Sequence, residues 1–132
     1  MAKFSSPFVS TRRGAPARPC LPVRFSNPHN GLFVDAYALI DTGADECALP
    51  APFASVLGHH LENGQIKHVG TGNGVTTAYA HTTSIAFQDF TTGDVDIDYM
   101  PNLRVPLLGV RSFLSRFVLT VDYPRQVFSL SK

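Results

Sequence analysis

A strand-like alternation of side chains runs from residue 32 to residue 40 and leads directly into the tripeptide Asp41-Thr42-Gly43. Alternate positions of the run share one face, which consists of Leu32, Val34, Ala36, Ala38 and Ile40. An alternation of this length predicts a strand with one face in the core. The aspartate, hydroxyl residue and glycine that follow predict a tight loop displaying a carboxylate, or an ordinary turn with a solvated aspartate.

The rest of the chain consists of short apolar segments separated by turn-forming residues, including many of its 10 glycines and 10 prolines. This pattern predicts further strands at residues 21–25, 66–69, 94–99, 118–122 and 127–130, and a glycine-rich hairpin tip at residues 70–74. The turn-forming residues 27–31 predict a hairpin that joins residues 21–25 to the run from residue 32 to residue 40. Residues 50–57 predict a short helical turn ending before Gly58. Val110, Phe113, Leu114 and Phe117 have the spacing of one helix face. We therefore expect an all-β fold with one short C-terminal helix.

A length of 132 residues is enough for one ordinary core, so one folded domain is expected over residues 20–132. Residues 1–19 contain four basic and no acidic residues, with three prolines, and predict a flexible basic N-terminal arm. A partner contact or a targeting peptide is the alternative role for this arm. The formal net charge of +1 argues against strong attraction to nucleic acid, although a binding module whose arm touches nucleic acid or acidic membranes stays open.

No apolar run approaches the ~20 residues that span a bilayer, and the N-terminus lacks a secretory signal, so we expect a soluble, cytoplasmic protein. Cys20 and Cys47 lack metal-ligand spacing and predict two ordinary thiols. The five histidines share no metal-binding spacing either. The alternating acids Asp94, Asp96 and Asp98 predict a solvated strand face, because calcium loops need another spacing. No metal or cofactor is therefore expected.

Three segments together resemble the retropepsin family, the retroviral-type aspartic proteases and their cellular relatives. The first is Ala38-Leu39-Ile40-Asp41-Thr42-Gly43-Ala44-Asp45. The second is Val69-Gly70-Thr71-Gly72-Asn73-Gly74, which is similar to a flap, and the third is Leu107-Leu108-Gly109-Val110-Arg111-Ser112-Phe113-Leu114. Their order and spacing agree with the family over about residues 20 to 130.

The resemblance implies a closed β barrel in which Asp41, Thr42 and Gly43 form the catalytic loop in the floor of a cleft. Thr42 would buttress the loop, Leu107-Leu108-Gly109 would pack beneath it, and Gly43 would let the substrate backbone approach closely. Two departures concern flap closure and local ion pairing. Thr71 stands where many relatives carry an aliphatic residue, and Arg111 stands where cellular relatives often have Asp.

The chain has a single Asp-Thr-Gly loop, whereas two-lobed aspartic proteases carry two such loops in a chain more than twice as long. The resemblance therefore implies a two-fold homodimer with one Asp41 from each copy. Two adjacent carboxylates share one proton, so one acid draws a proton from water while the other donates to the scissile carbonyl oxygen. Ala44 lacks the hydroxyl that pepsin-like enzymes usually have there, which predicts an optimum in mild rather than strong acid.

The implied substrate is an extended peptide that joins the cleft as an added strand, bonded by Gly70 of the flap and by Asp45 and Glu46 of the floor. By the same resemblance, side-chain pockets are formed by Leu39, Ala48, Val105 and Leu107, with Ala44 and Thr71 alongside. Apolar pockets predict apolar residues beside the cleaved bond, although these four residues also suit an ordinary core. The alternative function is a catalytically idle module of the same fold that dimerises or binds peptides.

Overall fold

The computed structural model describes residues 2–132 and is built mainly of strands. The strands are β1 (Phe4–Pro7), β2 (Cys20–Ser26), β3 (Phe33–Ile40), β4 (Ala48–Pro50), β5 (Gln65–Thr71), β6 (Gly74–Phe87), β7 (Phe90–Met100), β8 (Leu107–Leu108), β9 (Val118–Asp122) and β10 (Val127–Ser131). The helical segments are α1 (Phe53–Val56) and the 3-10 helices η1 (Leu61–Asn63) and η2 (Leu114–Arg116). Within residues 2–132, no helix is long and apolar enough to cross a membrane.

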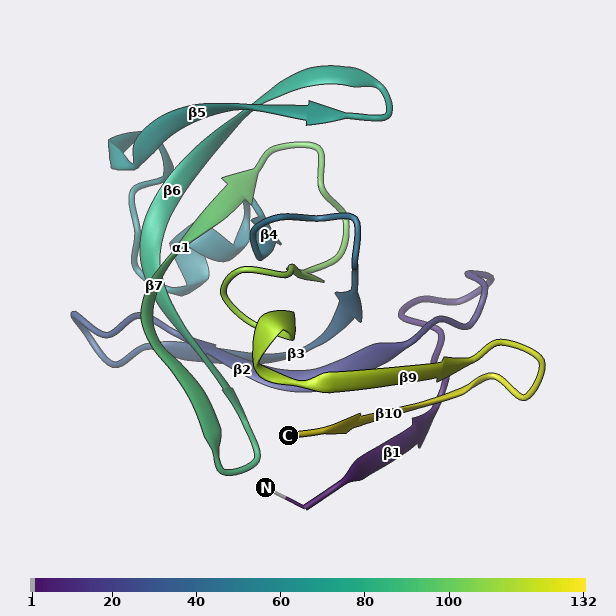
Figure 1. Ribbon diagram of the computed structural model, residues 1–132. Helices are drawn as coiled ribbons and strands as arrows, with labels where there is room; N and C mark the ends of the chain where they lie inside the picture. The colour runs from purple at the N-terminus through teal and green to yellow at the C-terminus, as the bar shows by residue number, and fades with distance from the viewer. Residues whose placement is uncertain (1) are drawn as a thin grey trace.

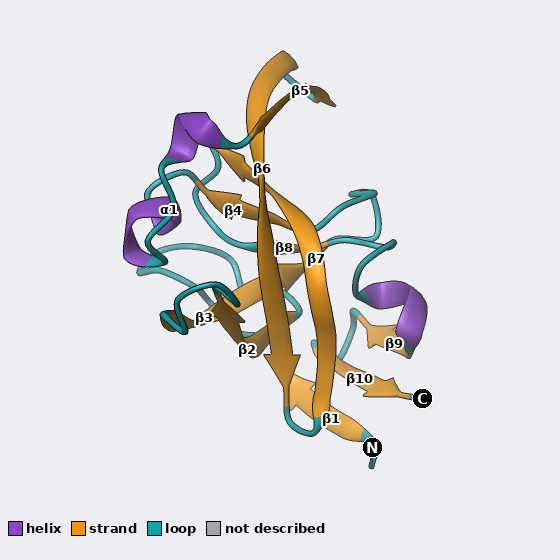
Figure 2. Cartoon of the chain, turned by 90° about the vertical axis from the view of Figure 1, so that its left-hand side faces the viewer, coloured by secondary structure: helices purple, strands orange, loops and turns teal. Residues whose placement is uncertain are grey.

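Seven strands form a sheet in the order β2-β3-β8-β4-β7-β6-β5, and it closes on itself because β2 also pairs with β6. The closing pairs join Arg24 to Ala86 and Phe25 to Ile85. The barrel predicted from the sequence is therefore confirmed. Strand β5 lies outside the closed ring and pairs only with β6, so the two strands form a hairpin that projects at the top of the molecule (Figure 1). The long strands β6 and β7 run side by side down one wall (Figure 2).

Strand β3 has the two faces predicted from its alternation. Ala38 and Ile40 are buried, whereas Phe33, Asp35 and Tyr37 are exposed. The predicted hairpin is also confirmed, because β3 pairs antiparallel with β2 throughout, from Ser26↔Phe33 to Cys20↔Leu39. This pairing fixes the end of β3, where Asp41 begins.

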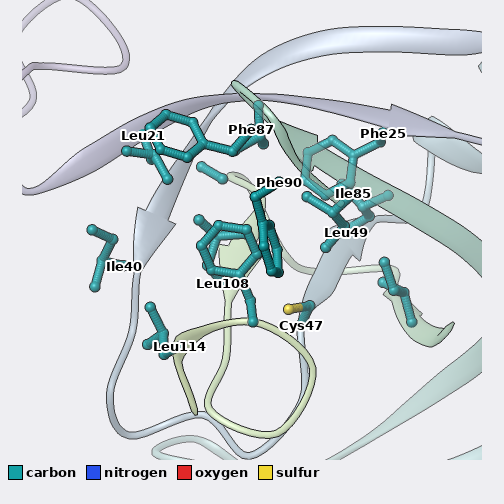
Figure 3. Close-up of a cluster of buried hydrophobic side chains, with 14 of the residues drawn as sticks. Leu21, Phe25, Ile40, Cys47, Leu49, Ile85, Phe87, Phe90, Leu108 and Leu114 are labelled. Atoms are coloured by element: carbon teal, nitrogen blue, oxygen red, sulfur yellow. The ribbon is translucent and has the colours of Figure 1, made fainter. Parts of the chain in front are cut away.

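The barrel encloses one main apolar core (Figure 3). Leu49, Ile85 and Leu108 converge in it from three different strands, and Cys47 lies at its edge near Leu108. Both cysteines are buried free thiols, in agreement with the sequence prediction. Because leucine-sized side chains contribute roughly 1.5–3 kcal/mol each when fully buried, this core is the main stabilising element of the barrel.

The N-terminal segment differs from the flexible arm that its prolines and charges suggest. Phe4–Pro7 forms β1, which pairs antiparallel with β10 in a separate sheet of order β1-β10-β9. Phe4 packs edge-on against Phe87 with ring centroids 5.0 Å apart, and Val9 forms a bridge with Arg18. Composition missed this strand because one aromatic anchor and a long-range backbone partner outweigh the local signals.

The predicted C-terminal helix is present but shorter than the interval from Val110 to Phe117. Only Leu114–Arg116 is helical, as η2, and the preceding residues form turns. Phe113 and Phe117 both contact Phe90 edge-on, with ring centroids 5.5 and 4.8 Å away. This aromatic cluster holds a compact turn that must reverse directly into β9, which leaves no room for a regular helix.

A histidine cluster lies on the core-facing side of β6 and β7, opposite the side that carries Asp98, where Tyr99 is fully buried. His59 stacks on His81 with ring centroids 4.5 Å apart, and Tyr99 contacts both rings edge-on. Burial lowers the pKa of His59, and the neighbouring His81 and His29 lower it further, while a backbone hydrogen bond to Thr82 acts weakly in the opposite direction. His59 is therefore held neutral in the folded protein.

We expect the stability of the fold to decrease in mild acid because of His59. A histidine whose pKa is depressed on folding carries no penalty above its unfolded pKa of about 6.5, and the penalty grows as the pH falls toward the lower folded-state pKa. Chemical denaturation between about pH 7.5 and pH 5 should show this loss, and His59→Gln should reduce it. The exposed neighbour His60 provides the matched control variant, His60→Gln. An equal pH slope in wild type and His59→Gln would contradict the assignment.

Candidate active site

The Asp41 loop follows β3 and is closed by its own backbone. The N–H of Gly43 donates to Asp41 Oδ1 at 3.0 Å, and the N–H of Ala44 donates to the Asp41 carbonyl oxygen at 3.2 Å. Asp41 is half-buried, whereas Thr42 and Gly43 are exposed. One carboxylate oxygen is thus held by the loop, and the short side chains beside it leave the acid accessible.

A second segment of the chain, residues 106–111, clamps this loop from below. Strand β8 pairs in parallel with the end of β3, with Ile40 opposite Leu108, and the N–H of Asp41 donates to the Leu108 carbonyl oxygen at 3.1 Å. Beyond β8, the N–H groups of Val110 and Arg111 donate to the carbonyl oxygens of Ala44 and Asp45, each at 2.9 Å. The packing of this segment beneath the loop agrees with the expectation from the sequence.

Gly109 makes the close approach of the two segments possible. A Cβ atom at this position would overlap the backbone carbonyl group of Glu46 and lie 2.9 Å from the carbonyl oxygen of Ala44. The N–H of Gly109 donates to Cys47 Sγ at 3.3 Å. Burial raises the pKa of Cys47 to about 11, so this thiol stays protonated and serves as part of the packing.

Asp41 faces a cleft of about 810 Å³ between the loop and the β5–β6 hairpin. Its lining contains most of the residues that the sequence assigned to the site, namely Asp41, Gly43, Ala44, Asp45, Glu46, Ala48, Gly70, Thr71 and Leu107. Residues from β4, β8 and the hairpin are thus brought to one concave surface, although more than 60 positions separate Ala44 from Leu107 in the chain. A volume of about 810 Å³ lies within the range typical of ligand-binding clefts.

Three sequence-assigned residues lie elsewhere. Leu39 and Val105 line a separate cavity of about 470 Å³, whose other walls include residues of the N-terminal segment. Thr42 is not among the residues that line the cleft, and it is exposed in the single chain. In this one subunit, only Ala48 and Leu107 of the four expected pocket residues reach the cleft.

The cleft also contains residues that the sequence analysis missed, above all Lys67 and Asp98. Asp98 was expected on a solvated face, but it is only 5% exposed, and its carboxylate pairs with Lys67 Nζ at 2.9 Å. The prediction for Asp98 was wrong because the burial of β7 changes along its length. Residues 91–96 are exposed or half-buried, whereas residues 97–100 are buried. The alternation of acids was visible in the sequence, whereas the partner strand that covers Asp98 was not.

The tip of the β5–β6 hairpin is closed by Thr71. Its hydroxyl donates to the Gly74 carbonyl oxygen at 3.0 Å and accepts the N–H of Asn73 at 3.2 Å. Gly74 has a φ of +110°, which disfavours a side chain there. Thr71 therefore organises the turn by hydrogen bonds instead of presenting an aliphatic side chain.

The remaining charges of the cleft floor are partly paired. Arg111 bonds Glu46 Oε1 at 3.1 Å, and Ser112 donates to Glu46 Oε2 at 3.4 Å, while Asp45 is exposed. Arg111 thus holds Glu46 against the loop clamp. Across residues 2–132, no three His, Cys, Asp or Glu side chains are grouped to hold a metal ion.

Comparison with known proteins gives consistent results. Residues 30–116 match the family model described as gag-polyprotein putative aspartyl protease. No curated protein matches the chain. The crystal structure of a retropepsin-like aspartic protease from Rickettsia conorii is similar with a TM-score of 0.71 and 22% identity, covering 98% of this chain and 99% of that one. The protease of EIAV, complexed with the inhibitor HBY-793, is similar with a TM-score of 0.55 and 18% identity, covering 80% of this chain and 92% of that one. These two structures share the fold.

Substitution of Gly109 tests the clamp. We expect Gly109→Ala to lower the free energy of unfolding by about 1–3 kcal/mol or more, because the new methyl group meets rigid backbone. Gly70→Ala is the matched control, since a Cβ atom there has no heavy atom within 4 Å. Chemical denaturation of both variants measures the difference, and equal stabilities would show that the segments can separate without cost.

Proposed function

We propose that this chain, which belongs to the family of gag-polyprotein putative aspartyl proteases, hydrolyses peptide bonds as a homodimer with one Asp41 from each copy. The observation that carries the proposal is the position of Asp41. Asp41 directly follows the barrel strand β3, on a loop that is held by residues 106–111. One of its carboxylate oxygens accepts the Gly43 N–H, and the residue lines a large cleft. A solvated turn aspartate needs neither the clamp nor the cleft.

The need for a second copy follows from the sequence and from the exposed loop. The 132-residue chain contains one Asp-Thr-Gly tripeptide, so a pair of such acids requires two chains. Thr42 and Gly43 are exposed beside Asp41, and a two-fold axis at this point would cover them and bring the two carboxylates together. Thr42 in this arrangement buttresses the Asp41 loop.

Paired carboxylates supply the chemistry without a metal or a covalent intermediate. Two acids about 3 Å apart cannot both be charged at low cost, so they hold one proton between them. The ionised acid takes a proton from a bound water, and the resulting nucleophile attacks the scissile carbonyl carbon while the protonated acid donates to its oxygen. When the C–N bond breaks, the acid that took the proton from water donates it to the leaving amine nitrogen, and the other acid takes its proton back from a hydroxyl of the intermediate.

The surrounding residues position the peptide. Its backbone lies extended between Gly70 of the hairpin and Asp45 and Glu46 of the floor, and Gly43 permits close approach. Ala44 offers no hydroxyl bond that would favour the charged carboxylate, which supports activity in mild rather than strong acid.

Removal of the acid tests the chemistry. Asp41→Asn should reduce kcat/KM on a mixed peptide library by at least about 10²-fold, because an amide can neither accept nor deliver the proton. Asp94→Asn, at an exposed position of β7, is the matched control and should retain activity. Rates measured from about pH 3 to pH 8 should peak in mild acid, and a maximum well below pH 4 would contradict the role given to Ala44.

The same measurements distinguish peptide hydrolysis from the alternative function, a catalytically idle module that binds peptides. Cleavage that persists in Asp41→Asn would overturn the mechanism. A wild-type protein that binds peptides but cleaves none would instead identify an idle peptide-binding module of the same fold.

Mixed dimers test the sharing of the site. Wild type refolded with an excess of Asp41→Asn should lose activity per wild-type subunit, because most wild-type chains then pair with a copy that lacks the second acid. Activity per subunit should also fall on dilution below the dimer dissociation constant. Unchanged activity per subunit in both experiments would show that one chain acts alone.

A further inference from the structure

The ion pair between Lys67 and Asp98 lies within the candidate substrate cleft, where the sequence predicts only apolar pockets. Lys67 Nζ lies 2.9 Å from Asp98 Oδ1, and the two side chains are 38% and 7% exposed. Both line the same cleft as Asp41. A nearly buried carboxylate facing a binding surface affects which ligand groups can be covered there.

Strand register shows that the pair belongs to one rigid wall. Lys67 on β5 lies opposite Ala78 on β6, and Asp98 on β7 lies opposite Ala80, so all four side chains share the cleft face. The strands are consecutive in one hydrogen-bonded sheet. The ion pair therefore spans β6 within one sheet. Since it does not join two parts that could move apart, it does not act as a latch that holds the β5–β6 hairpin closed.

Small apolar side chains surround the carboxylate. Asp98 lies opposite Ala80 on one side and opposite Ala48 of β4 on the other. Ala48, Ala78 and Met100 form a small apolar cluster here, separate from the main core. The part of the cleft that is lined by Ala48, Met100, Lys67 and Asp98 forms a recess with apolar walls and a polar base.

The base of this recess has unused hydrogen-bonding capacity. The contact with Lys67 uses Oδ1, and for residues 2–132 no hydrogen bond to Oδ2 is found. Lys67 has two further N–H donors and is partly exposed. In the free protein, water can satisfy these groups through the cleft.

A ligand side chain that enters the recess displaces this water. An apolar side chain would cover the charges without replacing the lost hydrogen bonds, which is unfavourable. A neutral side chain with both a donor and an acceptor, such as asparagine or glutamine, can bond Asp98 Oδ2 and Lys67 Nζ together. A charged ligand side chain of either sign would lie beside one residue of the same charge, either Lys67 or Asp98, which is unfavourable.

We propose that Lys67 and Asp98 form a specificity-determining subsite that selects a neutral, hydrogen-bonding substrate side chain at one position near the cleaved bond. This inference rests on the proposed peptide cleavage. It assigns polar recognition to the recess at Lys67 and Asp98, in a cleft that is also lined by the apolar residues Leu103 and Leu107.

The experiment compares peptides that carry Asn or Leu, which have similar shape, at each position around the cleaved bond. Wild type should prefer Asn at one position by about 10-fold in kcat/KM. Lys67→Met/Asp98→Leu should reverse the preference at that position alone. Arg24→Gln/Asp35→Asn removes an exposed ion pair of 2.8 Å on β2 and β3 and is the matched control, with the wild-type preference expected.

The single variants make opposite predictions. Lys67→Met leaves the carboxylate alone and should shift the preference at that position to Lys or Arg, whereas Asp98→Asn leaves the ammonium group and should shift it to Glu. If variants at the buried Asp98 fail to fold, Lys67→Met at its partly exposed partner still provides the test.

Binding of non-cleavable hydroxyethylene peptides with the same Asn or Leu substitutions, measured by calorimetry, separates the two proposals. Cleavage or binding without any position that responds to Lys67 and Asp98 would overturn the subsite and leave the proposed function intact. If wild type binds the Asn peptide more tightly but cleaves nothing, the recognition stands and the enzymatic function fails. A wild type that neither cleaves nor binds peptides overturns both.

Discussion

The clamp between the Asp41 loop and residues 106–111 is the contact on which the candidate site depends. Backbone N–H groups of Asp41, Val110 and Arg111 cross between the two segments, and each finds a carbonyl partner at 2.9–3.1 Å. Tight loops near a barrel end carry backbone groups that no sheet can pair, and a second loop is the way to satisfy them without water. The carboxylate is thus fixed by backbone bonds, which side-chain substitutions around it do not remove.

The clamp also explains the small and buried residues beneath it. Because the segments come within backbone contact, position 109 has no room for a side chain, and the thiol of Cys47 fills the remaining space as an acceptor for the Gly109 N–H. Strand β8 is only two residues long, yet it pairs with both β3 and β4. The barrel thereby connects the Asp41 loop to the wall of the cleft through a single short strand.

The parts of the fold that the sequence predicts are those governed by local patterns. The alternation before Asp41, the β2–β3 hairpin, the glycine-rich hairpin tip and the turn before Gly58 follow from side-chain period and turn chemistry, and the structure has each of them. The strand at Phe4–Pro7 was missed because its partner, β10, lies at the other end of the chain. Asp98 was misplaced for the same reason, since its burial depends on Lys67 and on the register of β5 against β6.

The same distinction between local patterns and long-range pairing applies to the residues of the candidate site. Asp41 and the segment beneath it are predictable because a resemblance covers contiguous motifs, whereas the composition of the cleft wall depends on which alternate residues of three strands face inward. Leu39 and Val105 show the limit, because in the single chain they line a different cavity from Ala48 and Leu107.

The sheet of β5, β6 and β7 separates two chemically different faces, and this links the proposed activity to stability. Asp98 faces the cleft with Lys67, while its neighbour Tyr99 points to the opposite face, where it contacts His59 and His81 and bonds Thr83 at 2.8 Å. Burial raises the pKa of Tyr99 to about 12, and burial is also the main cause of the lowered pKa of His59. The loss of stability expected in mild acid therefore arises at His59, on the face opposite to the cleft. Because Asp98 and Tyr99 are adjacent in β7, one strand contributes both to the candidate subsite and to the surroundings of this histidine.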